Sequence, residues 1–216
     1  MRVMVVLSGG IDSAVLLYHL KQQGHEVRSL CVDYGQRHHT EVTCAAALAV
    51  AAQTDHQTVT VPGLADIWRG TALINDKVAP SVSTWFVPNR NMILLSIAIG
   101  HALASGFDAV AYGAHRNDVY PDSREEFAQA MDEAARVCDW KGVRLLRPFM
   151  DKSKSEIIAL GDNLGVPWDL TWSCYTPGPP CLECAACIKR QEAFEDARVV
   201  DPLVATAARR TGVTSA

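Results

Sequence analysis

Short apolar runs alternate with helical patterns along most of the chain. The runs that predict β-strands lie at Val3–Leu7, Val27–Val32, His56–Val61, 108–113 and 143–149. Helical spacing covers about 13–23, 40–53, 91–105, 124–139 and 153–165, and the tail over 182–207 is mostly helical as well. Strands this apolar have no face suited to water. The pattern therefore predicts an α/β fold in three layers, with a parallel sheet between two layers of helices.

Local signals sharpen several of these boundaries. Gly24 ends the first helix, and Thr40 is the expected N-cap of the second. Ser153 and Glu156 have the spacing of a capping box at the start of a later helix. Residues 62–88 show no strong periodicity, and a connection of that length within a compact domain is usually functional or mobile.

The composition is that of a globular protein, with 49% hydrophobic and 20% charged residues among 216. Such a chain forms one large domain, or one domain with a small appendage. The formal net charge of −4 lacks the basic balance of most nucleic-acid-binding proteins, so a nucleic-acid partner is not expected. No apolar run approaches the ~20 residues of a membrane span, and the N-terminus resembles a core strand rather than a signal peptide. We therefore expect a cytoplasmic protein that does not bind membranes.

A glycine-rich turn, Ser8-Gly9-Gly10-Ile11-Asp12-Ser13, joins the first predicted strand to the first helix. Ligands of parallel α/β sheets bind at the carboxyl ends of the strands, where the next helix offers free N–H groups and the positive end of its dipole. Glycines let the backbone approach an anion, and the two serine hydroxyls can donate to its oxygens. The turn is therefore predicted to hold a phosphate chain.

The residues around the glycines restrict the chemistry further. No lysine follows them, which suits a site that holds pyrophosphate as a leaving group rather than one that transfers the γ-phosphate. Asp12 would then lie near a Mg²⁺ ion or order the loop. The alternative is a tight turn whose glycines serve geometry alone. The arrangement resembles the PP-loop pyrophosphatase superfamily, which implies a Rossmann-like domain of the HUP class, expected over residues 1–165, that activates substrates by adenylation.

Four of the seven cysteines lie in one short segment, at Cys174, Cys181, Cys184 and Cys187. Four thiolates at this spacing can close a tetrahedron around one Zn²⁺ ion, which leaves no position for water and makes the site structural. We therefore expect residues 166–216 to form a helical zinc-binding subdomain. An iron–sulfur cluster and a reactive C-x-x-C pair are the alternatives. The other cysteines, Cys31, Cys44 and Cys138, have apolar neighbours and are expected in the core.

Five further motifs occur in order: VDYGQRHHTE at 32–41, FVPNRNMIL at 86–94, YPDSREEF at 120–127, RPFMDKSKSEII at 147–158 and TWSCY at 171–175. Together they resemble the 7-cyano-7-deazaguanine synthase family, from Val3 to about Phe194. The resemblance implies a carbon–nitrogen ligase that converts 7-carboxy-7-deazaguanine and ammonia to the nitrile with two ATP, through an amide. The product of that family feeds 7-deazapurine pathways such as that of queuosine. A homodimer is also implied.

The resemblance assigns roles to individual residues. It implies ATP-binding roles for Ser8–Ser13, Asp33 and Tyr34. Substrate binding is implied for Gln36, Arg37, Arg90, Asn91 and Asp122. The expected catalytic residues are Asp12, Arg90 and Asp122.

Structural alternatives exist for several of these residues. Arg90 and Asn91 could simply begin a helix, and Asp122 could be a helix N-terminal charge. Lys152 and Lys154 could neutralise phosphate charge, but a solvated surface is the expected place for both. The same holds for His38 and His39.

The chain departs from the family pattern in a few places. The loop at 113–123 is shorter than usual, Ser123 stands where many members carry cysteine, and Asn89 stands where glycine is frequent. The spacing between Cys174 and Cys181 is also compact. Two alternatives stay open: a relative that forms an amide or transfers the acyl group to another amine, and a PP-loop enzyme that modifies tRNA. A non-catalytic nucleotide-binding protein is a further one.

Overall fold

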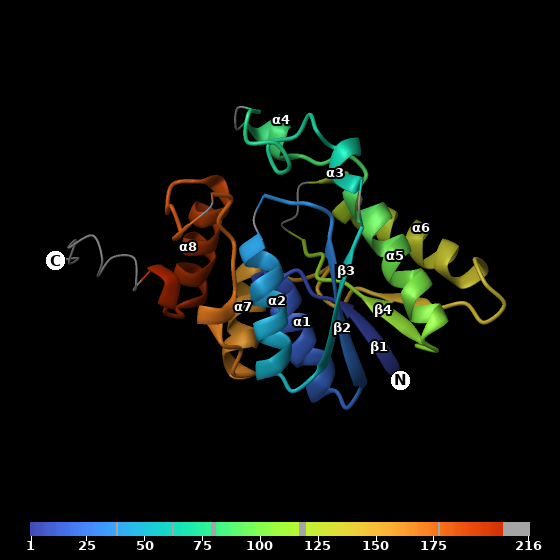
Figure 1. The fold of residues 1–216 in the computed structure, drawn as a ribbon. Coiled ribbons are helices and arrows are strands. Elements are labelled where there is room, and N and C mark those ends of the chain that lie inside the picture. Colours follow the sequence, from blue (N-terminus) through green and yellow to red (C-terminus); the bar gives the residue numbers. More distant parts are fainter. Residues whose placement is uncertain (38, 62, 79–80, 117–119, 177, 205–216) are drawn as a thin grey trace.

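The computed structural model describes residues 1–37, 39–61, 63–78, 81–116, 120–176 and 178–204, in which five parallel strands form the central sheet (Figure 1). The strands lie in the order β3-β2-β1-β4-β5. Every neighbouring pair is parallel, which confirms the predicted sheet. The bounds are β1 Arg2–Val6, β2 Glu26–Asp33, β3 Asp55–Thr60, β4 Ala109–Ala111 and β5 Arg144–Leu146.

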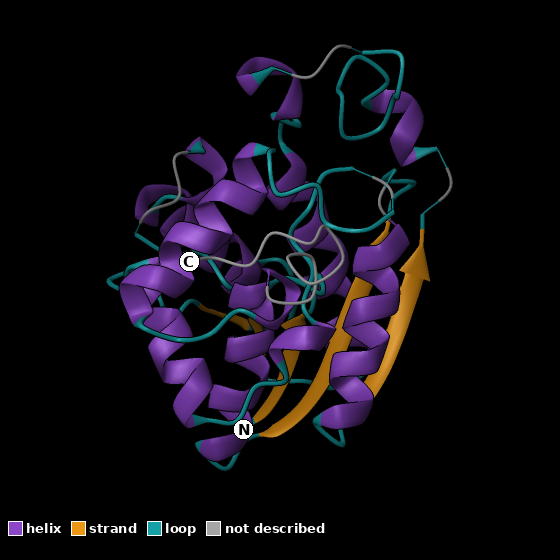
Figure 2. Cartoon of the chain, turned by 90° about the vertical axis from the view of Figure 1, so that its left-hand side faces the viewer, coloured by secondary structure: helices purple, strands orange, loops and turns teal. Residues whose placement is uncertain are grey.

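Helices cover both faces of the sheet and complete the three predicted layers. Alternating side chains of β1 show why, because Val3 and Val5 enter one core and Met4 enters the other. Figure 2 shows the helices of the first core lying in front of the strands, with α8 on that side. This layer contains α1 (Ile11–Gln22), α2 (His39–Ala51), α7 (Lys154–Asn163) and α8 (Ala185–Ala197). The opposite layer contains α5 (Arg90–Ala104) and α6 (Glu125–Val137).

The long connection between β3 and α5 extends beyond the carboxyl ends of the strands (Figures 1 and 2). It contains two short helices, α3 (Leu64–Ile67) and α4 (Val82–Trp85). Leu64, Trp68 and Leu73 pack with Tyr34 into a small separate core at this end of the sheet. The connection therefore lies where a ligand of a parallel sheet would bind.

The local predictions meet different outcomes. The capping box of α7 is confirmed, because Ser153 Oγ accepts from Glu156 N at 3.2 Å and Glu156 Oε2 accepts from Ser153 N at 2.7 Å. The N-cap prediction for Thr40 is wrong, because α2 already begins at His39.

Cys31 is buried as predicted, whereas Cys138 is exposed just after α6. Two short 3₁₀ turns occur at Pro121–Ser123 and Trp168–Leu170. Within the described ranges, every helix is too short or too polar to cross a membrane.

A buried ion pair fastens the C-terminal segment to the rest of the molecule. Arg190 of α8 donates to both carboxylate oxygens of Asp201, at 2.6 and 2.9 Å, and both side chains are only 4% exposed. The same guanidinium donates to the carbonyls of Thr171 and Trp168. Phe194 of α8 packs in the core that contains α1, and the expected domain boundary at residue 165 stays a prediction.

This ion pair yields a prediction about stability. Asp201→Asn leaves the Arg190 charge buried without its counter-ion, so we expect the free energy of unfolding to fall by about 3 kcal/mol, measured by urea denaturation. Asp55→Asn removes an ion pair with Arg28 in which the carboxylate side chain is 80% exposed, and it should cost less than about 1 kcal/mol. Equal losses in the two variants would contradict the assignment.

Candidate active site

The turn between β1 and α1 is held open by its own serines. Ser8 N donates to Ser13 Oγ at 3.2 Å, and Ser13 Oγ donates to the Gly10 carbonyl at 3.1 Å. The two hydroxyl oxygens are 3.1 Å apart. Gly9 has φ +84°, and a side chain there would collide with the Glu41 carbonyl of α2. The predicted phosphate loop therefore has the backbone geometry that only glycine permits at this position.

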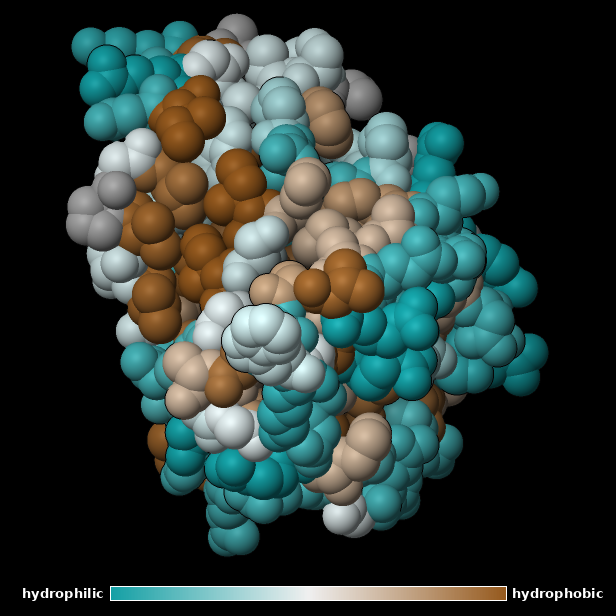
Figure 3. All heavy atoms as spheres, turned by 90° about the vertical axis from the view of Figure 1, so that its right-hand side faces the viewer, coloured by the Kyte–Doolittle hydropathy of each residue, from teal (hydrophilic) through white to brown (hydrophobic). Residues whose placement is uncertain are grey.

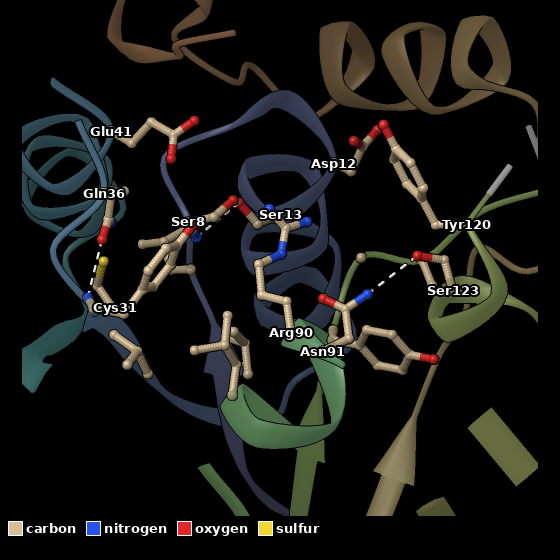
Figure 4. Close-up of a pocket in the computed structure, with 18 of the residues that line it drawn as sticks. Ser8, Asp12, Ser13, Cys31, Gln36, Glu41, Arg90, Asn91, Tyr120 and Ser123 are labelled. Carbon is tan, nitrogen blue, oxygen red and sulfur yellow. Dashed lines mark hydrogen bonds between the residues drawn. The ribbon is translucent and has the colours of Figure 1, made fainter. Parts of the chain in front are cut away.

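A cavity of about 330 Å³ lies against this loop, at the carboxyl ends of β1, β2 and β4 (Figure 4). The loop contributes Ser8, Asp12 and Ser13. Tyr34, Gln36, Arg90 and Asn91, all expected at the site from the sequence, line the same cavity. The structure thus brings the glycine-rich turn together with the motifs at 32–41 and 86–94. The cavity between them is large enough for part of a nucleotide or for a small heterocycle.

Asp12 lines both this cavity and a second one of about 550 Å³. Its Oδ2 accepts from Lys154 Nζ at 2.9 Å, and His115 Nε2 is 3.8 Å away. Its buried Oδ1 has no hydrogen-bond partner among the described residues. The expectation that Lys154 is a solvated surface lysine is wrong, because its side chain is 27% exposed and contacts the loop. The side chain of Lys152 is 35% exposed, and its Nζ lies 3.9 Å from the exposed carboxylate of Asp151.

Glu41 is a cavity residue to which the sequence assigned no role. Its carboxylate lies in the first turn of α2 and lines the cavity beside Arg90 (Figure 4). Burial raises the Glu41 pKa to about 7, and the nearby Arg90 charge opposes this rise only in part. Burial also raises the pKa of Tyr34, against the opposing effect of Arg90. Glu41 ends the motif at 32–41, so its position in that motif was the signal that could have identified it.

Asn91 and Asp122 bind each other across 31 residues of sequence. The backbone N–H of Asn91 donates to Asp122 Oδ2 at 3.0 Å, and Asn91 Nδ2 donates to the Asp122 carbonyl at 3.0 Å and to Ser123 Oγ at 3.1 Å (Figure 4). Asp122 therefore uses one carboxylate oxygen to hold the start of α5. It lines a third cavity of about 40 Å³ instead of the 330 Å³ cavity beside the loop.

Three of the expected site residues, Gly9, Asp33 and Arg37, line none of these cavities. Asp33 Oδ1 accepts from Gly35 N at 3.0 Å and shapes the turn after β2. Arg37 Nη1 donates to the Ala72 carbonyl at 3.2 Å and ties the same turn to the long connection. Neither side chain is among those that line the 330 Å³ cavity, and His38 lies outside the described residues. His39 is exposed, as expected.

The four clustered cysteines meet at one point. Their sulfur atoms all lie within 4.8 Å of one another, with Cys174 Sγ 3.5 Å from Cys181 Sγ and Cys181 Sγ 4.0 Å from Cys187 Sγ. A tetrahedral ion with bonds of ~2.3 Å to sulfur requires edges of about 3.8 Å. The cluster therefore fits a single metal ion. Burial opposes ionisation of Cys181, but N–H groups of Glu183 and Cys184 donate to its sulfur and lower its pKa to about 6.

The cysteine segment also contacts the phosphate loop. Trp172 N donates to the Gly9 carbonyl at 2.8 Å, and the indole of Trp172 donates to the Cys174 carbonyl at 2.9 Å. Tyr175 follows directly and lines all three cavities. The segment that would bind the metal thus forms part of the wall of the site.

Solved structures of other proteins share this architecture. The U34-tRNA thiolase NcsA from Methanococcus maripaludis, with its [4Fe-4S] cluster, is 16% identical, with a TM-score of 0.55 over 100% of this chain and 74% of that one. NMN synthetase from Francisella tularensis is 14% identical, with a TM-score of 0.55 over 99% and 87% of the two chains. At such identity the likeness shows the α/β fold alone.

Sequence comparison is more specific. The 7-cyano-7-deazaguanine synthase of Archaeoglobus fulgidus is 43% identical over 215 residues, which cover 94% of this chain and 90% of the relative. The enzyme of the same name from Pseudoalteromonas translucida is 39% identical and is covered to 97%. The family model described as queuosine biosynthesis protein QueC matches residues 2–198, and the chain belongs to this family.

Proposed function

We propose that this protein is a cytoplasmic 7-cyano-7-deazaguanine synthase. It converts 7-carboxy-7-deazaguanine and ammonia to the nitrile and uses two molecules of ATP. The observation that carries the proposal is the phosphate loop on the floor of a cavity that also holds Arg90. A guanidinium fork binds carboxylate or phosphate, and the loop supplies amides and hydroxyls for the phosphate chain.

The chemistry needs positioning more than acid and base groups. A carboxylate is a poor electrophile, so it first attacks the α-phosphorus of ATP and releases pyrophosphate. Ammonia then displaces AMP to form the amide. A second ATP activates the amide oxygen, and loss of AMP gives the nitrile. Holding the reacting groups in line and neutralising the developing charge supply most of the rate enhancement.

Residues in and around the cavity have distinct roles in this proposal. Ser8 and Ser13 donate to the α-phosphate and pyrophosphate, and Arg90 holds the attacking carboxylate. Asp12 Oδ1, which is buried and has no partner among the described residues, would bind Mg²⁺ together with the phosphates of ATP. Mg²⁺ would neutralise phosphate charge there.

Asp122 acts through Asn91, because it fixes the start of the helix that carries Arg90. Asp33 and Arg37 act by shaping the turn beside the nucleotide.

Glu41 is the proposed proton acceptor. Attack by ammonia releases a proton, and formation of the nitrile removes two more from the amide nitrogen. A carboxylate with a pKa of about 7 that lines the cavity is suited to accept them near neutral pH. The titratable and charged groups around Glu41 are Arg90, Tyr34, Tyr175, Cys31 and Cys44.

We further propose that the cysteine cluster holds Zn²⁺, as the structural part of a unit over residues 166–216 beside the adenylation unit of residues 1–165. The close spacing of the sulfurs supports one ion, because each thiolate of a four-iron cluster binds a different iron. The zinc would crosslink Cys174 to α8 through Cys187.

A homodimer through the outer face of α5 is also proposed. Figure 3 shows apolar side chains gathered on this side of the molecule. Met92 of α5 is 46% exposed and Ile67 of α3 is 67% exposed. The residues on the solvent side of α5 after Met92 are small, namely Ser96, Gly100 and Ala104, so a second helix could approach it closely.

The proposed reaction is tested by incubating the protein with ATP, 7-carboxy-7-deazaguanine and ammonium and weighing the product by mass spectrometry. We expect the nitrile and two AMP per nitrile. Asp12→Asn should lower AMP formation about 100-fold, because it weakens charge neutralisation at the loop. Asp151→Asn alters an exposed carboxylate near the site and should leave the rate unchanged. An amide with one AMP, or AMP formation by Asp12→Asn at the parental rate, would contradict the proposal.

The role of Glu41 predicts a pH dependence. A base works when it is deprotonated, so kcat should rise with pH up to about 7 and then level off, at a constant concentration of free ammonia. Glu41→Gln should lower kcat about 100-fold and abolish this rise. If the variant keeps the same pH profile, Glu41 is not the proton acceptor.

The metal proposal predicts one zinc per chain by elemental analysis. Cys184→Ser removes one of the four proposed ligands, so the protein should lose most of its zinc. The midpoint of thermal unfolding should fall as well, because the metal no longer crosslinks the loop to α8. Cys138→Ser removes an exposed cysteine outside the cluster and should keep the full metal content. Iron and sulfide in place of zinc would refute the assignment.

A further inference from the structure

The smallest of the three cavities is lined by aromatic residues from three distant segments. Trp85 and Phe86 come from the long connection, Tyr120 from the turn before α6, and Tyr175 from the cysteine segment. The rings form two stacked pairs. Trp85 and Tyr175 have centroids 4.4 Å apart at 27°, and Phe86 and Tyr120 have centroids 5.5 Å apart at 22°. We refer to this cavity, with its four aromatic residues, as the aromatic slot.

The aromatic slot continues into the 330 Å³ cavity beside the phosphate loop. Tyr120, Tyr175 and Arg90 line both spaces. The slot alone, at about 40 Å³, is too small for a bicyclic base, so it can take only the edge of a ring whose remainder lies in the 330 Å³ cavity. Figure 4 shows Arg90 reaching toward the loop serines, and Tyr120 lies across the cavity from Glu41.

From this geometry we infer that the aromatic slot binds the flat heterocycle of the acid substrate, with the rings of Tyr175 and Tyr120 against its faces and Arg90 on its carboxylate. The inference rests on the proposed function and adds a specificity site to it. Stacking on aromatic side chains favours a planar base, since every base has a π face.

The charges around the slot fit the orientation of such a substrate. Arg90 lies at the junction, between the slot and the loop that binds phosphate. A carboxylate on the five-membered ring would therefore point to the loop while the six-membered ring enters the slot. Asp122 also lines the slot, and only its Oδ2 is engaged by Asn91 N. In this orientation its second oxygen would accept from the amino group of the base.

Tyr175 reaches the slot because of the segment that precedes it. Cys174 belongs to the cysteine cluster, and Trp172 N donates to the Gly9 carbonyl, so two contacts hold the backbone just before Tyr175. The half-buried ring of Tyr175 lines the slot. An aromatic ring on a backbone held in this way is a suitable stacking surface.

The test uses binding of 7-deazaguanine, which has the base but no carboxylate, measured by calorimetry in the presence of a non-hydrolysable ATP analogue. Tyr175→Leu should weaken this binding about 10- to 50-fold, because stacking on an aromatic side chain is lost. Tyr175→Phe retains a ring and should bind within about 2-fold of the parent. Affinity for the ATP analogue and zinc content should be unchanged in both variants.

Arg90→Lys provides the complementary variant. It should weaken binding of 7-carboxy-7-deazaguanine at least 10-fold and leave 7-deazaguanine binding unaffected, because only the acid carries the carboxylate. Tyr175→Leu should weaken both ligands equally.

Three results would overturn the inference. They are unchanged 7-deazaguanine binding in Tyr175→Leu, an equal loss of ATP-analogue affinity in that variant, and failure of Tyr175→Phe to restore binding. Failure of the proposed function is a separate result, because the parent protein would then form no AMP that depends on the acid.

Discussion

The tight approach of α2 and β4 to the loop after β1 is the constraint on which the site depends. A side chain at Gly9 would collide with the Glu41 carbonyl, and one at Gly113 would come within about 3 Å of Asp12 and Ser13. Two glycines therefore let a helix from one side and a strand end from the other close around the same turn. This closeness brings Glu41 and Asp12 to one cavity, together with the serines of the loop. Larger residues at either position would separate the elements that carry the chemistry.

The sheet, the loop and the cysteine cluster could be predicted because their signals are local. Apolar runs indicate strands, and residues 8–13 indicate a turn that binds an anion. Four cysteines within 14 positions can reach one ion. Lys154 could not be placed in this way. It lies 142 residues from Asp12, and only the packing of α7 against α1 brings the two side chains to 2.9 Å. The aromatic slot likewise joins segments that no spacing rule connects, and Cys138 has apolar neighbours in sequence but solvent around it in the fold.

Asp122 shows how a local interpretation and a functional one can hold for the same side chain. Its carboxylate binds a free N–H at the start of a helix, but this helix is α5, 31 residues earlier in the chain, rather than the α6 that follows it. The sequence could indicate a helix-terminal charge without showing which helix it serves. Because α5 carries Arg90, the contact links the turn before α6 to the cation of the cavity.

The cysteine segment explains why a closed metal site, which leaves no position for substrate, belongs in this architecture. Three residues of the stretch 172–175 contact different parts of the molecule. Trp172 binds the phosphate loop, Cys174 belongs to the cysteine cluster, and Tyr175 stacks on Trp85. This stretch has no regular secondary structure, so hydrogen bonds of a sheet or helix cannot fix it. The buried Arg190–Asp201 pair holds α8 beside it, and the proposed metal would add a crosslink from Cys174 to α8. Such a metal would act on the reaction through position alone, because it would immobilise the backbone that supports both the phosphate loop and the aromatic wall.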